Sequence, residues 1–91
     1  MNEQGIVYIL RSLKTDKFYV GSTNNLTRRL EEHNRGHSTY TRDTGPYELV
    51  FSQGYPSLTV ARRIEQWLKA QKSAKFLERI IKEGEIKKKV S

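Results

Sequence analysis

The sequence contains no cysteine, which excludes disulfide bonds, cysteine nucleophiles and thiolate zinc sites. Proline and glycine are few, at 2 and 6 of 91 residues, and no Pro/Gly-rich segment marks a linker. No apolar run approaches the roughly 18 residues of a membrane span, and the N-terminus lacks the pattern of a secretory signal. These absences predict a single domain without a membrane partner, in a reducing compartment, for which the cytoplasm is the default.

Acidic side chains are outnumbered, with 10 Asp and Glu against 17 Lys and Arg, so the net charge is +7. The excess is uneven, because residues 46–91 hold ten basic and five acidic side chains and therefore +5 of the total. Lys and Arg that neutralise phosphates release counterions and supply sequence-independent affinity. The charge therefore favours a polyanionic partner, with nucleic acid foremost.

Hydrophobic periodicity and turn residues predict six elements in the order ββαβαα. Their approximate bounds are 5–13, 18–21, 24–35, 47–51, 56–71 and 73–84. The residues from Ser22 to Asn25 are N-cap candidates for the first helix. Gly36 is placed to end that helix in the left-handed conformation, and Ser73 to cap the last helix. The order predicts an α+β fold, with a three-stranded antiparallel sheet flanked by helices. We expect one domain over residues 1–83 and a basic tail over residues 84–91, which contains Lys87 to Lys89.

Two polar residues interrupt the apolar face of the first predicted helix. Leu26, Arg29, Leu30 and His33 follow the i, i+3, i+4, i+7 spacing of one helical face. A structural interpretation has Arg29 extending its stem along the core edge and His33 as a satisfied boundary residue. A functional interpretation places both in a site.

Glu65 raises the same question in the second helix. Leu58, Ala61, Ile64 and Leu68 form its apolar face, and Glu65 falls inside that arc. A carboxylate there needs a partner, either Lys69 at i+4 or Arg62 at i−3, or else a metal ion. Mg²⁺ is often held through one carboxylate, with water and phosphate oxygens completing its octahedron.

The two hairpin strands each carry a tyrosine, Tyr8 and Tyr19, and Gly21 follows the second. Strand tyrosines usually only pack, but glycine at a strand end allows a backbone or a phosphate to come close. The amide-rich segment from Ser22 to Asn25 would favour an anion at the start of the first helix.

These positions together resemble the GIY-YIG nuclease superfamily, in particular its small stand-alone bacterial and archaeal members. Ile6-Val7-Tyr8, Tyr19-Val20-Gly21, Arg29 and Glu65 carry the likeness, which covers about residues 4–80. The resemblance implies the GIY-YIG endonuclease fold and a hydrolase that cleaves DNA phosphodiester bonds with one Mg²⁺ or Mn²⁺ on Glu65. The catalytic residues that it implies are Tyr8, Tyr19, Arg29, His33 and Glu65.

Roles follow from that likeness. We expect Arg29 to neutralise transition-state charge and Tyr8 to activate water, with Tyr19 holding phosphate or water and His33 sharing the proton transfer. Tyrosine has a pKa of about 10, so a base near neutrality would need a lowered pKa.

Repair-type members carry a lysine directly after the Tyr-x-Gly motif, where this chain has Ser22. We expect Ser22 and Thr23 to cap the first helix, or to donate hydrogen bonds to a phosphate. Other candidate substrate-binding residues share a basic or polar character or a close backbone, and they are Gly21, Tyr40, Arg42, Arg62 and Arg63.

We expect no second domain that reads bases, and therefore little sequence specificity. The hypothesis is DNA binding and cleavage in DNA repair or processing, by a monomer or weak dimer that a targeting protein directs. The alternatives are a non-catalytic nucleic-acid-binding module of the same fold and a purely structural interaction domain.

Overall fold

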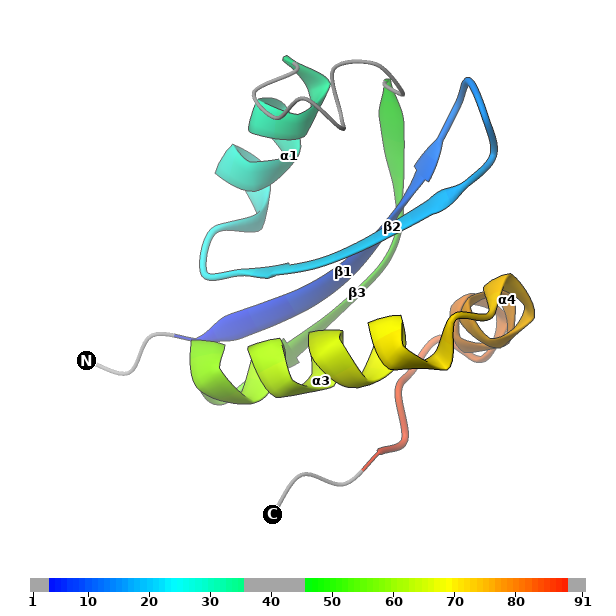
Figure 1. The fold of residues 1–91 in the computed structure, drawn as a ribbon. Helices are drawn as coiled ribbons and strands as arrows, with labels where there is room; N and C mark the ends of the chain where they lie inside the picture. Colours follow the sequence, from blue (N-terminus) through cyan, green and yellow to red (C-terminus); the bar gives the residue numbers. More distant parts are fainter. Residues whose placement is uncertain (1–3, 36–45, 89–91) are drawn as a thin grey trace.

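The computed structural model describes residues 4–35 and 46–88, which form a three-stranded sheet and three helices (Figure 1). The elements in chain order are β1 (Gly5–Ser12), β2 (Phe18–Thr23), α1 (Leu26–Asn34), β3 (Tyr47–Tyr55), α3 (Leu58–Gln71) and α4 (Ala74–Glu83). The predicted α+β class and the ββαβαα order are confirmed. Within the described ranges, no helix has the length and apolar character needed to cross a bilayer.

The sheet is antiparallel, with strand order β2-β1-β3, so the central strand is β1 and β2 forms one edge. Tyr8 lies opposite Gly21 in β2 and opposite Ser52 in β3. Because successive side chains point to opposite faces, β1 supplies two different cores. Val7 and Ile9 face α3, whereas Tyr8 and Leu10 face α1. Figure 1 shows α1 and α3 on opposite sides of the sheet.

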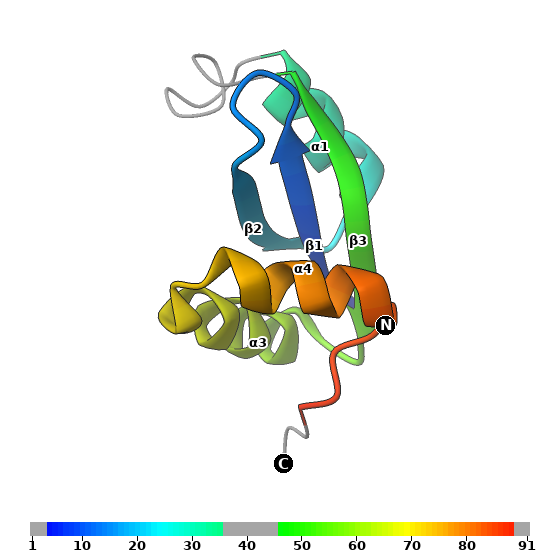
Figure 2. The same ribbon diagram turned by 90° about the vertical axis from the view of Figure 1, so that its right-hand side faces the viewer.

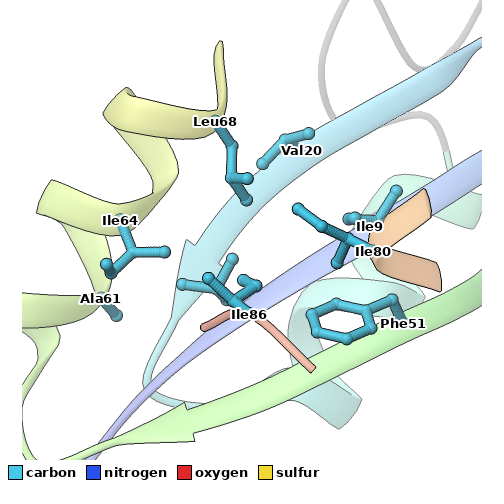
Figure 3. Close-up of a cluster of buried hydrophobic side chains, with 9 residues drawn as sticks. Ile9, Val20, Phe51, Ala61, Ile64, Leu68, Ile80 and Ile86 are labelled. Carbon is cyan, nitrogen blue, oxygen red and sulfur yellow. The ribbon is translucent and has the colours of Figure 1, made fainter. Parts of the chain in front are cut away.

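The larger core lies between the sheet and the two C-terminal helices (Figure 3). Ala61, Ile64 and Leu68 of α3 meet Ile9 and the rest of the β1 face, as their helical spacing predicts. Ile80 of α4 and Ile86 beyond it close the cluster. Figure 2 shows α4 beside α3 on this side of the sheet.

Gly5 permits α3 to approach the start of β1. A Cβ at Gly5 would lie 2.7 Å from both Ala61 Cβ and Leu58 Cα, which is inside van der Waals contact. Only a residue without a side chain fits between β1 and the first turn of α3. The glycine therefore sets the height of α3 against the sheet, and with it the position of every residue on that helix.

Several predicted boundaries need correction. β3 continues to Tyr55, beyond the expected end at Phe51, because its pairing with β1 extends to Gly5. Helix α1 begins at Leu26 and is capped by Asn25, whose side chain accepts a hydrogen bond from the Arg28 amide. Of the cap candidates from Ser22 to Asn25, the structure therefore confirms Asn25, and the expected capping by Ser22 or Thr23 is wrong. Gly36 lies outside the described residues.

Candidate active site

The candidate site is built around two consecutive residues of the edge strand β2, Gly21 and Ser22. Gly21 faces the α1 side of the sheet, and the Tyr8 phenol occupies the space that a side chain at Gly21 would fill. Ser22 faces the α3 side, where its hydroxyl donates a hydrogen bond to Oε1 of Glu65. Gly21 was expected to leave room for a phosphate, but that room holds the Tyr8 ring.

Tyr8 reaches His33 on the α1 side. The Tyr8 hydroxyl lies 3.0 Å from His33 Nε2, and both residues are almost fully buried, at 2% and 3% exposed. The Tyr19 ring packs edge-on against the imidazole, with the ring centroids 4.8 Å apart. When the imidazole is neutral and carries its proton at Nδ1, Nε2 accepts a hydrogen bond from the Tyr8 hydroxyl. The structure thus joins both motif tyrosines to the histidine one turn after Arg29.

Arg29 interacts with the Tyr8 phenol. Burial raises the pKa of Tyr8 above its ordinary value, and the interaction with Arg29 opposes that rise. The phenol in turn raises the pKa of Arg29. Arg29 Nη1 also lies 3.3 Å from Glu32 Oε1 in a half-exposed pair, so the guanidinium is close to the site and accessible from solvent. With its pKa raised, the Tyr8 phenol is protonated at neutral pH. A tyrosine that acts alone as a base would instead need a lowered pKa.

Both carboxylate oxygens of Glu65 are bound. Ser22 donates to Oε1, and Lys69 Nζ lies 2.6 Å from Oε2. The Glu65 side chain is 18% exposed, while that of Lys69 is 52% exposed. Of the partners considered from the sequence, Lys69 at i+4 is therefore the one observed. Glu65 also acts on the pKa of Tyr8, which places the carboxylate within electrostatic range of the phenol.

The Glu65 carboxylate fits a single divalent cation. Among the described residues, no three His, Asp or Glu side chains gather into a metal-binding group. Mg²⁺ commonly uses one or two carboxylates and keeps several waters, so Glu65 alone is a suitable protein ligand. Because the Lys69 side chain is half-exposed, it can move into solvent and leave Oε2, while Ser22 keeps the carboxylate oriented through Oε1.

The remaining candidates are scattered. The Thr23 hydroxyl is nearly buried, and it both accepts from the Asn25 amide and donates to the Asn25 carbonyl. Arg62 and Arg63 are exposed on α3. Tyr40 and Arg42 lie outside the described residues. Of the described candidates, Thr23, Arg62 and Arg63 have no observed contact with Tyr8 or Glu65, and the roles of all these positions stay predictions.

Tyr47 is a member of the aromatic cluster that the sequence did not indicate. Its ring centroid lies 6.3 Å from both Tyr19 and His33, and its amide donates to the Asn34 side chain. It starts β3, far along the chain from the other rings. In the sequence it was only the first residue of the predicted strand 47–51, and an aromatic residue in a strand indicates packing rather than a site.

The buried imidazole predicts a pH-dependent stability. Burial and the nearby Arg29 charge lower the pKa of His33 below 6.5. The unfolded chain then binds the proton more readily, so stability is full above about pH 6.5 and falls as the pH drops towards the folded-state pKa. Urea unfolding between pH 7.5 and pH 5 should show this loss. In His33→Gln the slope across that window should shrink, and an unchanged slope would show that other groups cause it.

Comparisons with known proteins identify the family of this chain. The GIY-YIG catalytic domain family matches residues 4–88. A UPF0213 protein of Oceanobacillus iheyensis is 39% identical over 70 residues, which are 76% of this chain and 80% of that protein. Another, from Nitratidesulfovibrio vulgaris, is 38% identical over 71 residues, 77% of this chain but only 64% of that longer protein.

A solved structure shares the fold. The solution NMR structure of a UPF0213 protein from Bacillus halodurans superimposes with a TM-score of 0.55 at 34% identity, covering 87% of this chain and 83% of that one. The family match covers every element that holds Tyr8, Tyr19, Arg29, His33 and Glu65. The chain therefore belongs to the GIY-YIG family, among its small UPF0213 members.

Proposed function

We propose that this protein is a divalent-metal-dependent endonuclease that hydrolyses DNA phosphodiester bonds with little sequence specificity. The observation that carries the proposal is the convergence on Gly21 and Ser22: Tyr8 packs on the first, and Glu65 is bound by the second. A phenol–imidazole pair, a guanidinium and an oriented carboxylate thereby lie around one end of an edge strand. Packing alone does not require this combination of groups.

Arg29 is the residue placed to stabilise charge on the reacting phosphate. Its guanidinium is always protonated and can donate two parallel N–H bonds to phosphate oxygens. It interacts with Tyr8 and remains half-exposed, so a phosphate can reach it without disrupting the core. Negative charge that builds up during in-line attack would be neutralised there.

Tyr8 and His33 form the proton-transfer pair. We assign the phenol oxygen of Tyr8 to accept the proton of the attacking water while its own proton passes to His33 Nε2, 3.0 Å away. Since the pKa of His33 is lowered, the imidazole is neutral at pH 7 and free to accept. Tyr19, half-buried against the imidazole, would orient the water or the phosphate.

Glu65 would hold the divalent cation. When bound, such a cation supplies Lewis-acid stabilisation of the leaving oxygen. Ser22 orients the carboxylate through Oε1, and Lys69 must release Oε2 before a cation can coordinate there.

Cleavage assays test the proposal directly. End-labelled single-stranded, duplex and branched DNA, with RNA alongside, would be incubated with wild type and Glu65→Ala in Mg²⁺, Mn²⁺ and EDTA. We expect cleavage of DNA that needs the metal and vanishes in Glu65→Ala. The variant, purified in parallel, reveals any contaminating nuclease. Equal cleavage by both proteins, or none on any substrate, would refute the assignment.

One observation favours the second candidate, a nucleic-acid-binding module without catalysis. Both Glu65 oxygens are satisfied within the protein, by Ser22 and Lys69, so the carboxylate has a structural partner already. Isothermal titration with Mn²⁺ separates the two functions. A nuclease should bind one Mn²⁺ through Glu65, whereas the binding module should take up none that Glu65→Ala removes.

A further inference from the structure

A groove of about 490 Å³ opens beside the candidate active site. It lies between the β1–β2 turn with the adjoining part of β2 and the junction of α3 with α4. In Figure 1 the hairpin end of β2 and the α3–α4 junction lie on the same side of the molecule. Apart from Tyr19 and Lys69, the residues that line the groove have no role in the proposed catalytic mechanism.

The groove meets the site at Lys69, which lines it and holds Glu65 Oε2. Tyr19 also contributes to the lining, but its ring packs on His33, on the opposite face of the sheet from Phe18. A strand in the groove therefore comes to Glu65 first, and it reaches the phenol–imidazole pair only around the edge strand β2.

The lining combines apolar and cationic groups. Phe18 and Leu77, both partly buried, contribute apolar surface, and Lys17 and Lys72 stand exposed beside it, one on each wall. Proteins that bind single-stranded nucleic acid combine cations that follow the backbone with aromatic side chains on which the bases stack. The volume lies in the range of roughly 300–1,000 Å³ typical of small-ligand pockets, so the groove accommodates a short stretch of a single strand.

We propose that this groove binds single-stranded DNA and guides it past Lys69 to Glu65. The inference rests on the proposed nuclease function and specifies its substrate as DNA with a single-stranded arm. Lys17 and Lys72 contact phosphates, and Phe18 contacts a base.

Two acidic residues also line the groove, Asp16 and Glu78, and both are exposed. Their negative charges repel phosphates and lower the affinity of the groove for DNA. Removing these charges therefore tests the proposal through a gain of affinity. Removing their charges in Asp16→Asn/Glu78→Gln should tighten binding several-fold, because the lysines then act on the strand without competing carboxylates.

Fluorescence anisotropy in EDTA measures binding without cleavage. The probes are a labelled dT12, the RNA counterpart U12 and a 12-base-pair duplex. We expect Lys17→Glu/Lys72→Glu to lose about tenfold in dT12 affinity, and the salt dependence to fall by about 1.4 for two phosphates lost. The matched control is Lys14→Glu/Lys82→Glu, with the same charge change at exposed lysines of the same turn and of α4 outside the groove lining. The control should lose less than about twofold.

The outcomes separate the groove from the nuclease. If both double variants lose the same dT12 affinity, the loss reflects net charge alone, and the proposed binding in the groove is overturned. A wild type that prefers the duplex, or U12 over dT12, would also overturn it as stated. If the groove variants alone lose dT12 binding while wild type cleaves nothing, the groove stands and the nuclease fails. If Lys17→Glu/Lys72→Glu cleaves DNA with a single-stranded arm as fast as wild type does, the nuclease proposal stands and the role of the groove is refuted.

Discussion

Glu65→Gln is expected to reduce metal-dependent cleavage by about a thousandfold or more while the fold survives. A metal contributes several kcal/mol of transition-state stabilisation, and each 1.36 kcal/mol or so corresponds to a tenfold change in rate. Glutamine keeps the shape and can still accept from Ser22, but it has no charge with which to hold a cation.

The stability change should be small in the same variant. The pair between Lys69 and Glu65 is half-exposed on the lysine side, and such pairs contribute about 0–1 kcal/mol. Unfolding in urea should therefore give a free energy within about 1 kcal/mol of wild type. The expected loss is thus confined to activity and metal binding.

Glu83→Gln is the matched control for that experiment. Glu83 forms an i,i+4 pair with Arg79 on α4, so the substitution removes a comparable surface ion pair away from the site. It should leave both cleavage and stability near wild type. If Glu65→Gln instead unfolds the protein, or cleaves as well as Glu83→Gln does, Glu65 is a structural residue and the metal assignment is wrong.

Gly21→Ala is expected to destabilise the fold by about 1–3 kcal/mol and to remove most activity. The new Cβ would lie 2.5 Å from Tyr8 Cζ, so the phenol must move. Tyr8 is 2% exposed and sits against His33, and its displacement breaks the 3.0 Å contact between hydroxyl and Nε2. Urea unfolding and the cleavage rate would be measured on the same preparation.

Gly54→Ala, in contrast, is expected not to destabilise the fold. Gly54 lies in β3, and a Cβ there meets nothing within 4 Å. Alanine restricts the unfolded chain more than glycine does, so this variant should be neutral or stabilised by up to about 1 kcal/mol. If the two variants behave alike, the close approach of Tyr8 to Gly21 does not control stability or catalysis.

Local patterns were sufficient to predict the elements. The 3.6-residue spacing of Ala61, Ile64 and Leu68 identified the face of α3 that enters the core, and Ser73 was recognised as the cap of α4. The end of β3 was missed, because the pairing that extends it to Tyr55 comes from β1 across the sheet. The cap candidates of α1 included Asn25, which is the observed cap, whereas Ser22 binds Glu65 and the Thr23 hydroxyl bonds the Asn25 backbone.

The sequence by itself determined which residues were out of place: Arg29, His33 and Glu65 are polar groups on apolar helical faces, and the periodicity shows this without any coordinates. Only the tertiary structure decided how they connect. Tyr8 fills the space at Gly21, and Ser22 and Lys69 share the Glu65 carboxylate. Such contacts join residues up to 43 positions apart, and they depend on strand register and on the height of α3 over Gly5. Spacing along the chain cannot encode these distances, because they arise from packing between elements.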